Sequence, residues 1–593
     1  MQQKMINIKI DNIDTKVPEG ITILDACKEL NINIPALCHL KNISSVASCS
    51  LCVVEVSGAR NLQRSCVTKV KDGMKIYTNT ERVRKARLMN MELLLASHPE
   101  NCLTCERNQD CDLRKMAFDM GVRSVRFDKV TEHKFDKDDT SPSIVRDPDK
   151  CVLCRRCVEV CANMQNVYAI EVVNRGKQSR VSTFFDEGLA KVDCVNCGQC
   201  IMVCPTGAIV EKDSASDVWK DLHDPEKIVF VEVAPAVRAA LGEEFGFAPG
   251  TLVTGKIPTA LRRLGFTKVF DTQFSADLTI MEEGSELIQR LKTNGKLPLI
   301  TSCSPGWIKF AEHFFPNIFE NISTCKSPQQ MFGAIAKTYY AEKLKVDPRK
   351  IVVVSIMPCT AKKFEARRPE FISAFNYWKE KLSLKEKDVF PDVDHVLTTR
   401  EIARMIKESG INFSNLSDSQ FDNPLGVSTG AAVIFGVTGG VMEAALRTAY
   451  ELITGKSLEK VEFVDVRGFE GIKTAEINLN GKQIKVAVAH TLSNAKKLLE
   501  EVDKGISPYT FIEIMTCPGG CLGGGGQPIP TNDEIRQLRA EAIYKEDKNK
   551  KIRKSHENPA IKALYEEFLK EPLGSLSHKL LHTKYVSRKN FVK

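Results

Sequence analysis

The sequence predicts a multidomain protein that is α+β in its first 226 residues and α/β beyond them. The chain has 593 residues, which is too long for one hydrophobic core. Most of its 21 cysteines are gathered in short groups with metal-ligand spacing, and the densest groups precede residue 227. After that residue, apolar runs such as KIVFVEVAPAV and KIVVVSIMP alternate with helical patterns, which is typical of an α/β domain.

Composition excludes several classes of protein. Hydrophobic residues make up 43% and charged residues 27% of the chain, as in ordinary globular proteins. No apolar run reaches about 18 residues, so we expect no membrane span, and the N-terminus lacks the apolar core of a signal peptide. The net charge of +9 is too mild to indicate nucleic-acid binding, but it suits an acidic electron-transfer partner. We therefore expect a cytoplasmic protein whose cysteines bind metal rather than form disulfides.

Residues 1–82 are expected to form a first cluster domain. Ile6, Ile8 and Ile10 alternate with polar residues as in a strand, and the helical stretch TILDACKEL, with Cys27 as core packing, follows. Four cysteines then have the spacing C-x10-C-x2-C-x13-C: Cys38, Cys49, Cys52 and Cys66. They favour a [2Fe–2S] cluster, although four thiolates also satisfy tetrahedral zinc. The segment resembles plant-type ferredoxin, with its β-grasp fold, and the N-terminal domain of the large complex I subunit.

Residues 83–126 predict a second cluster site after a helical stretch, RVRKARLMNMELLLAS. The candidate ligands have the spacing H-x3-C-x2-C-x5-C: His98, Cys102, Cys105 and Cys111. A single histidine near cysteines is often structural, but three cysteines need a fourth ligand, and an imidazole raises the cluster potential. The spacing is similar to that of the His-ligated [4Fe–4S] segment of complex I and iron-only hydrogenases.

Residues 127–226 begin with a charged linker, 128–149, and continue with two C-x2-C-x2-C-x3-C repeats. In this bacterial ferredoxin pattern, the fourth cysteine of each repeat binds the other cluster. One [4Fe–4S] cluster is thus expected on Cys151, Cys154, Cys157 and Cys204, and another on Cys194, Cys197, Cys200 and Cys161. Together with the two preceding sites, this predicts four clusters in series, which is an electron-transfer chain.

Residues 227–593 contain three further motifs: TSCSPGW at 301–307, MPCTAKKFE at 357–365 and EIMTCPGGCLGGGGQP at 513–528. In the last motif, Cys517 and Cys521 lie four residues apart and precede four glycines, Gly523 to Gly526. Two thiolates at this spacing can bind one metal centre from a tight turn, and glycines allow the backbone close to a bulky group. A glycine run without cysteines would indicate only a flexible loop.

Together the three motifs closely resemble the signature motifs of [FeFe]-hydrogenases, and with the four-cluster N-terminus the resemblance covers essentially the whole chain. It implies a catalytic domain over 227–593 with an H-cluster, a [4Fe–4S] cubane joined to a di-iron subsite that carries CO, cyanide and a dithiolate amine. It assigns Cys359, Cys517 and Cys521 as cubane ligands and Lys362 as a donor to cyanide. It also places four side chains in the wall around the cofactor: Met357, Met515, Phe435 and Gln329.

The resemblance further implies a proton channel. Cys303 matches the relay cysteine of the family, and the other positions are Glu283, Glu286, Arg290 and Ser323. Spacing alone gives another interpretation, because Glu286 and Arg290 are four residues apart and would form an ordinary surface ion pair.

One position departs from the family pattern. Ser304 stands where the family has the fourth cubane cysteine, and a serine oxygen is a harder, poorer iron ligand than a thiolate. Three alternatives stay open: Ser304 binds iron, Cys303 binds iron in its place, or Cys325 reaches the cubane.

Three functions compete. The first is reversible proton reduction and hydrogen oxidation, with electrons passing through the four clusters. The second is an electron-transfer subunit like those of complex I or formate dehydrogenase, which the three C-terminal motifs disfavour. The third is a sensory or assembly relative with little turnover, which Cys303 disfavours. Expected partners are ferredoxin or NAD(P)H-oxidising flavoprotein subunits of an electron-bifurcating complex, and maturation proteins that install the di-iron subsite.

Overall fold

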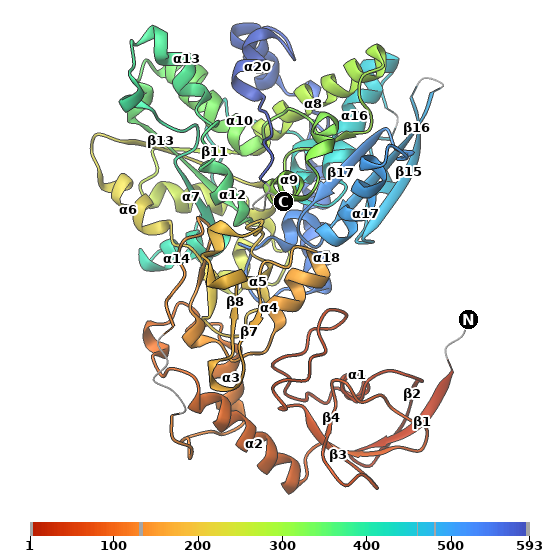
Figure 1. Cartoon of the computed structure of the whole chain (residues 1–593). Helices are drawn as coiled ribbons and strands as arrows, with labels where there is room; N and C mark the ends of the chain where they lie inside the picture. Colours follow the sequence, from red (N-terminus) through yellow and green to blue (C-terminus); the bar gives the residue numbers. More distant parts are fainter. Residues whose placement is uncertain (1–3, 130–134, 459, 480–481, 589–593) are drawn as a thin grey trace. The chain divides into compact units, whose positions relative to one another are not determined.

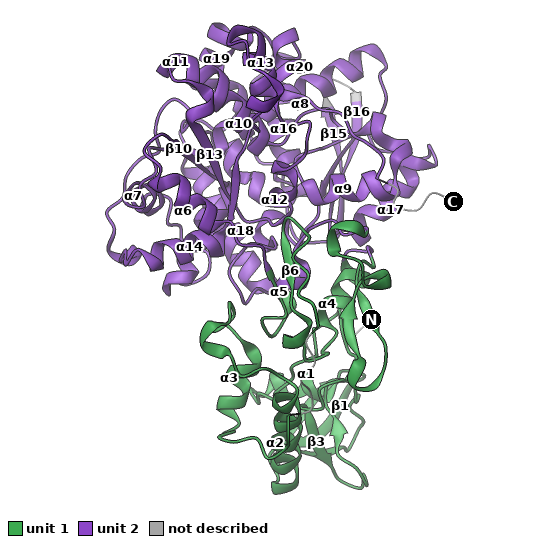
Figure 2. Ribbon diagram, turned by 60° about the vertical axis from the view of Figure 1, so that its left-hand side comes forward, with its two compact units in different colours: residues 1–164, 168–192, 203–210 green, residues 165–167, 193–202, 211–593 purple. Residues whose placement is uncertain are grey.

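The computed structural model describes residues 4–129, 135–458, 460–479 and 482–588 (Figure 1). Part of the predicted linker 128–149, residues 130–134, lies outside the described residues. The chain divides into two compact units (Figure 2). Unit 1 comprises residues 1–164, 168–192 and 203–210, and unit 2 comprises residues 165–167, 193–202 and 211–593.

Unit 1 begins with a five-stranded sheet in the order β2-β1-β5-β3-β4. Its strands are β1 (Met5–Ile10), β2 (Ile13–Pro18), β3 (Val53–Val56), β4 (Gln63–Arg64) and β5 (Lys75–Tyr77), and α1 (Ile23–Glu29) packs with them. Ile6, Ile8 and Ile10 are buried, since alternate residues of a strand point to one face. Cys27 lies in this core, as predicted. The arrangement confirms the expected ferredoxin-like fold.

The remainder of unit 1 is built from short elements around long loops. It contains α2 (Glu81–Ala96), α3 (Asp112–Asp119), α4 (Arg156–Glu159), β6 (Ile144–Arg146), β7 (Glu171–Val173) and β8 (Arg180–Ser182). Thr80 accepts a hydrogen bond from Val83 N (3.2 Å), which caps the N-terminus of α2. Further along the chain, α5 (Gln199–Val203) and β9 (Ile209–Glu211) follow.

Unit 2 contains two sheets. The first is parallel, in the order β11-β10-β13-β14, and consists of β10 (Ile228–Val233), β11 (Lys268–Asp271), β13 (Ile351–Met357) and β14 (His395–Thr398). The second has the order β12-β17-β16-β15, with β12 (Leu299–Ile300), β15 (Ile472–Leu479), β16 (Lys482–His490) and β17 (Phe511–Met515). Every residue of β13 is buried, as expected for a strand of a parallel sheet covered on both faces.

Helices surround both sheets, which confirms the predicted α/β class (Figure 1). They are α6 (Ala215–His223), α7 (Lys256–Arg263), α8 (Gln273–Thr293), α9 (Pro305–Phe314), α10 (Pro328–Ile335), α11 (Ala341–Leu344), α12 (Ala361–Ala366), α13 (Ser373–Lys381), α14 (Thr399–Glu408), α15 (Gly430–Val433), α16 (Gly440–Thr454), α17 (Leu492–Asp503), α18 (Asp533–Asn549), α19 (Pro559–Leu564) and α20 (Ser575–Leu581).

The three motifs of unit 2 occupy equivalent places in the two sheets. Each follows the carboxyl end of a parallel strand: 301–307 follows β12, Pro358 follows β13, and Thr516 follows β17. In open α/β sheets, ligands bind outside the carboxyl ends of the strands. The sheet topology therefore brings the predicted ligands to one region.

Candidate active site

The three motif loops line one cavity inside unit 2. The three predicted cubane ligands, Cys359, Cys517 and Cys521, all contribute to its wall. The other predicted cofactor residues line the same cavity: Cys303, Ser304, Gln329, Met357, Lys362, Phe435 and Met515. Methionine and phenylalanine make the wall apolar, and Phe435 and Met515 also belong to the hydrophobic core behind it.

Glycine makes this close convergence of loops possible. Gly520 has φ of +83°, and a Cβ there would lie 2.7 Å from Thr438 N. A Cβ on Gly524 would lie 2.0 Å from the carbonyl oxygen of Pro358, in the second motif. Both positions exclude a side chain, because real Cβ atoms do not approach other atoms so closely. The glycine run thus packs one cysteine motif directly against another.

Burial disfavours the ionised form of the cysteine thiols that line the cavity. Burial raises the pKa of Cys521 to about 12 and the pKa of Cys359 above its ordinary value. A buried thiol keeps its proton unless a metal replaces it, and thiolates are the soft ligands that iron–sulfur clusters use. Three such thiols in one apolar cavity fit the cubane that the sequence motifs imply.

Ser304 lies in the cavity wall but is engaged with a neighbour. Its hydroxyl oxygen lies 2.8 Å from Oγ1 of Thr516 and accepts a hydrogen bond from Thr516 N (3.3 Å). Sequence analysis gave Thr516 no role, because nothing in its spacing indicates that it meets Ser304. Ser304 therefore brings an oxygen, rather than a sulfur, to the cavity wall that the three cysteines also line.

Cys325 does not join this group. Its Sγ lies 4.0 Å from Oε2 of Glu286, and its backbone N donates a hydrogen bond to Oγ of Ser323 (3.3 Å). Its backbone forms a bridge with His582. The structure therefore places Cys325 beside a predicted channel residue and not among the lining residues of the cavity.

Three of the predicted channel residues, Ser323, Glu286 and Arg290, are joined by a hydrogen bond and an ion pair. Ser323 donates from Oγ to Oε2 of Glu286 (2.8 Å), and Arg290 pairs with Oε1 of the same carboxylate (2.6 Å). Burial, and then the charge of Glu286, raise the pKa of Glu283 to about 8. Burial, and then the charge of Glu283, raise the pKa of Cys303 well above its ordinary value. Glu283 thus influences the pKa of Cys303 and is itself influenced by Glu286, while both oxygens of its buried carboxylate are without a hydrogen-bond partner among the described residues.

The Glu286–Arg290 pair forms as spacing predicts, but it is not a surface pair. The two side chains are 9% and 14% exposed, and Arg290 also donates to the carbonyl oxygens of Lys296 and Glu320 (both 2.9 Å). The surface interpretation is wrong because helical spacing indicates which side chains are neighbours but not how deeply they lie.

Lys362, which sequence analysis expected to donate to a cyanide, also pairs with a protein carboxylate that sequence analysis missed. Its Nζ pairs with Oε2 of Glu365 (2.7 Å) and donates to the carbonyl oxygen of Cys303 (3.3 Å). Gln329 donates to the same Glu365 oxygen (3.3 Å). The only available signal was the i,i+3 spacing of Lys362 and Glu365. Glu365 holds the ammonium at the edge of the cavity.

Two of the predicted accessory sites are gathered within unit 1. The four [2Fe–2S] cysteines are all buried, and Sγ of Cys52 lies 3.3 Å from Sγ of Cys66. A second cavity is lined by the four cysteines predicted for one ferredoxin cluster: Cys151, Cys154, Cys157 and Cys204. This confirms that residues of both repeats meet at one place, as the bacterial ferredoxin pattern requires.

The His98 site also lies in unit 1. Burial, and then the charge of Lys150, lower the pKa of His98 to about 4, so the imidazole is neutral and able to bind metal. Cys111 contacts the carbonyl oxygen of Pro205 (3.5 Å), and a Cβ on Gly207 would lie 2.6 Å from Sγ of Cys105. Cys102, the remaining predicted ligand, is half-buried in the same segment.

Of the ligands predicted for the last cluster, Cys194, Cys197 and Cys200 belong to unit 2, and Cys161 belongs to unit 1. Within unit 2, Cys197 lines the motif cavity. Gln199 donates to the carbonyl oxygen of Gly523 (2.8 Å), and Thr360 donates to that of Asn196 (2.8 Å). The cysteine loop of this cluster therefore packs directly on the cavity wall.

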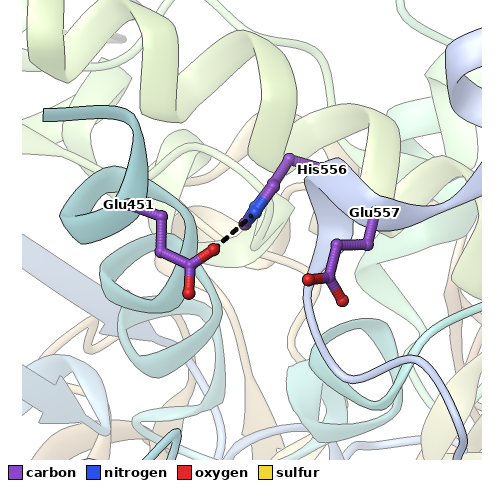
Figure 3. Close-up of side chains that lie close together, drawn as sticks. All are labelled: Glu451, His556 and Glu557. Atoms are coloured by element: carbon purple, nitrogen blue, oxygen red, sulfur yellow. Dashed lines mark hydrogen bonds and ion pairs between the residues drawn. The ribbon is translucent and has the colours of Figure 1, made fainter. Parts of the chain in front are cut away.

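A further group outside the cavity has metal-ligand residue types: Glu451, His556 and Glu557 (Figure 3). Lys554 already supplies its positive charge, with Nζ 2.7 Å from Glu451 and 3.3 Å from Glu557. His556 pairs with Glu451 through Nε2 (3.0 Å) and contacts Thr448 through Nδ1 (3.2 Å). The lysine and both bonded ring nitrogens make this a salt-bridge cluster.

Comparison with known families agrees with this geometry. The profile of the iron only hydrogenase large subunit, C-terminal domain, matches residues 227–525, and that of the iron hydrogenase small subunit matches residues 533–588. Three profiles match earlier segments: a 2Fe-2S iron-sulfur cluster binding domain at 3–81, the NADH-ubiquinone oxidoreductase-G iron-sulfur binding region at 87–126, and a 4Fe-4S dicluster domain at 150–208. The chain belongs to the iron-only hydrogenase family, and the expected iron–sulfur domains are confirmed.

Individual relatives cover nearly the whole chain. The NADP-reducing hydrogenase subunit HndD of Solidesulfovibrio fructosivorans is 52% identical over 98% of this chain and 99% of its own length. Iron hydrogenase 1 of Clostridium pasteurianum is 40% identical over 98% of this chain and 100% of its own length. The apo [FeFe]-hydrogenase HydA1 structure from Chlamydomonas reinhardtii is 44% identical, has a TM-score of 0.56, and covers 63% of this chain and 99% of that chain. The predicted enzyme class, an oxidoreductase acting on hydrogen, is thereby confirmed.

Within the described residues, none of the helices has the length and apolar character needed to cross a membrane.

Proposed function

We propose that the chain interconverts protons and hydrogen at an H-cluster held in the cavity of unit 2. The observation that carries this proposal is the meeting of Cys359, Cys517 and Cys521 in one apolar cavity whose wall also contains Cys303. When bound, the H-cluster supplies a di-iron centre with CO, cyanide and a dithiolate amine that makes or breaks the H–H bond. An apolar wall excludes water and competing ligands from such a group.

In this proposal, the three cysteines hold the cubane and Ser304 supplies the fourth ligand. Ser304 lines the cavity, and its contact with Thr516 fixes the position of its hydroxyl oxygen. Lys362, held by Glu365, directs its ammonium into the cavity for a cyanide, as a charge-assisted donor. Met357, Met515, Phe435 and Gln329 enclose the remaining space.

Protons pass between the cavity and the surface through the channel group. Cys303 carries a proton on Sγ beside the cofactor, and Glu283, Ser323 and Glu286 continue the route toward Arg290. The raised pKa of Glu283 favours a role in proton transfer, because a carboxyl with a pKa of about 8 can both bind and release protons near neutral pH.

We expect Glu283→Gln to lower hydrogen evolution by about 10²-fold or more, since an amide cannot exchange the proton. In the wild type, Glu283 is protonated below its pKa of about 8 and ionised above it. Proton delivery should thus weaken as pH rises through about 8, and the Gln variant should lose this feature. The measurement is viologen-driven hydrogen evolution across this pH range.

Glu232→Gln is the matched control. Glu232 is also buried, with a pKa raised to about 8, but it is in β10, where its carboxylate accepts a hydrogen bond from Oγ of Ser355 (2.6 Å), and it is not one of the channel residues. Equal losses in the two variants would contradict a relay role for Glu283.

Electrons reach the cavity through four clusters: one [2Fe–2S] and three [4Fe–4S]. We propose the domain boundaries 1–82, 83–126, 127–226 and 227–593 and the ligand sets given above. Cys197 provides the final link, because it lines the cavity from the last accessory site. We also propose that the protein is cytoplasmic and that dedicated maturation proteins install its di-iron subsite.

The external partner is ferredoxin, NAD(P)H-oxidising flavoprotein subunits, or both. Support comes from HndD, whose name describes a subunit of an NADP-reducing hydrogenase. Nicotinamide chemistry would then take place on another chain, since the sequence contains no flavin or nicotinamide fingerprint.

Hydrogen-dependent reduction of methyl viologen tests the proposed function. Protein matured with the di-iron subsite should reduce the dye rapidly, whereas protein that holds only its iron–sulfur clusters should not. Absence of dye reduction by matured protein with intact CO and cyanide infrared bands would favour a sensory role.

A further inference from the structure

A lysine of α9 is buried against the loop that carries three predicted cluster ligands of unit 2. Lys309 is 6% exposed, and its Nζ donates to Oδ1 of Asn196 (2.8 Å), a residue that lies between Cys194 and Cys197 in the chain. The ammonium also lies over the ring of Phe364, 4.2 Å from the ring centroid. None of the roles assigned above uses this side chain.

Lys309 lacks the counter-charge that most buried lysines of unit 2 have. Four of them pair with a carboxylate at 2.7 to 2.9 Å: Lys326 with Asp392, Lys337 with Asp394, Lys362 with Glu365, and Lys363 with Glu401. Within the described residues, Lys309 forms no ion pair with a carboxylate, and its one hydrogen bond goes to a neutral amide. A buried ammonium is costly unless an anion compensates its charge.

Carboxylates in this region are engaged by other side chains. Glu312, which is on the same helix, pairs with both Arg368 and Arg588 (2.6 Å each). His313, also on α9, pairs with Asp193 (3.2 Å). The missing anion must therefore come from another group.

The predicted cluster ligands provide an anion at this place. Four thiolates give a [4Fe–4S] cluster a net negative charge, which grows by one unit when the cluster accepts an electron. Burial lowers the pKa of Lys309 to about 8, and the group that opposes this shift most is Cys194. The side chain is thus mainly an ammonium at neutral pH, and the cysteine loop is the negative partner beside it.

We propose that the ammonium of Lys309 is the buried counter-charge of the cluster on Cys194, Cys197 and Cys200, and that it raises the reduction potential of this cluster. A fixed positive charge stabilises the reduced form more than the oxidised form, because the reduced cluster carries one more negative charge. Reduction adds one electron to the cluster and moves no proton, so Lys309 keeps its proton throughout.

Lys309 is therefore a positioning residue, since it acts on the reaction only through this cluster and does not line the cavity. The inference rests on the proposed function, in which Cys197 makes this cluster the last link to the cavity. A higher potential at the last link makes the cluster a better acceptor for electrons that hydrogen oxidation releases.

Lys309→Met tests the inference through a potential. Protein that holds its iron–sulfur clusters but no di-iron subsite is titrated with reductant and followed by electron paramagnetic resonance. We expect methionine to lower the equilibrium constant for reduction of one [4Fe–4S] cluster by about tenfold, which is about 59 mV for one electron. The other clusters should keep their potentials, and the shifted signal should be the one that Cys194→Ala removes.

Lys309→Arg and Lys473→Met are the matched controls. Arginine keeps the positive charge, so the potential should return to the wild-type value. Lys473 is likewise buried, at 5% exposure, and its Nζ donates only to the carbonyl oxygens of Thr438 (3.3 Å) and Gly468 (2.7 Å) among the described residues. Neither partner belongs to a cluster loop, so Lys473→Met should leave every accessory potential unchanged.

The potentials decide the inference. An unchanged potential in Lys309→Met, or equal shifts in Lys309→Met and Lys473→Met, would overturn it. If the methionine variant does not retain the cluster, Lys309→Gln takes its place, because glutamine removes the charge but can still donate to Asn196. The glutamine variant should show the same lowered potential, and an unchanged value there would equally count against the inference.

Turnover separates this inference from the proposed function. Exchange between D₂ and solvent protons needs no electrons from the accessory clusters, so matured wild type and Lys309→Met should form HD at equal rates. Hydrogen oxidation coupled to viologen sends electrons through the last cluster, and its rate should fall severalfold in the variant. Absence of HD formation in the wild type would refute the proposed function, whereas the potential shift would still test the role of Lys309.

Discussion

Replacing Cys303 with alanine should lower both hydrogen evolution and hydrogen oxidation by about 10²- to 10⁴-fold, the usual contribution of a positioned acid–base group. The side chain lies in the cavity wall, and burial and then the charge of Glu283 raise the pKa of its thiol, whereas Cys325 is not among the lining residues. Alanine leaves no group to pass the proton. The measurement is viologen-coupled turnover in both directions, on protein with a full iron content and unaltered CO and cyanide infrared bands.

Cys27→Ala is the control for this experiment. It also removes a buried thiol, but from the core of the first domain and outside every predicted ligand set. Turnover should stay at the wild-type rate. If Cys303→Ala kept its activity, the relay assignment would be wrong. If the variant instead lost the cubane, Cys303 would be an iron ligand and not a relay.

Cys517→Ala should abolish activity and remove the iron of the cubane, because the predicted ligand set then keeps only two thiols, Cys359 and Cys521, for a cluster that needs at least three protein ligands. Ser304→Ala should have a much smaller effect on iron content, since an oxygen binds iron less strongly than a thiolate. Its effect should appear in the electron paramagnetic resonance spectrum of the reduced cubane, through loss of the oxygen ligand. Iron analysis and this spectrum together form the measurement.

Ser304→Cys provides the complementary change. It supplies a fourth thiolate at a position that lines the cavity, so the cluster should be retained with a spectrum distinct from that of both wild type and Ser304→Ala. Identical spectra for the wild type and Ser304→Ala would exclude Ser304 as a ligand. Retention of the cubane in Cys517→Ala would refute the three-cysteine cradle.

Sequence predicted the site best where one short segment supplies several ligands. The spacing from Cys151 to Cys157 restricts three thiols to a short stretch of chain, and Cys204, which the repeat pattern predicts as the fourth ligand, lines the same cavity. Periodicity similarly identified Ile6 and Ile8 as core residues, because alternation along a strand determines which face is buried. These features depend on local geometry, which the order of residues specifies.

Features that depend on tertiary contacts could not be read in this way. The meeting of Ser304 and Thr516 joins residues 212 positions apart, and no pattern in either motif indicates it. The position of Cys325 beside Glu286, and not in the cavity, likewise depends on how β12 and the C-terminal residues pack. The family resemblance identified candidate residues, and only the fold shows which of them share a cavity.

The most direct test of the central claim is isotope exchange between D₂ and protons of the solvent, measured by mass spectrometry on matured protein. Formation of HD requires H–H bond cleavage and proton transfer but no external electron partner. We expect rapid HD formation by the wild type, little from protein that lacks the di-iron subsite, and a strongly reduced rate in Cys303→Ala. A failure to form HD in protein with intact CO and cyanide infrared bands would contradict the assignment of this cavity as a hydrogen-converting site.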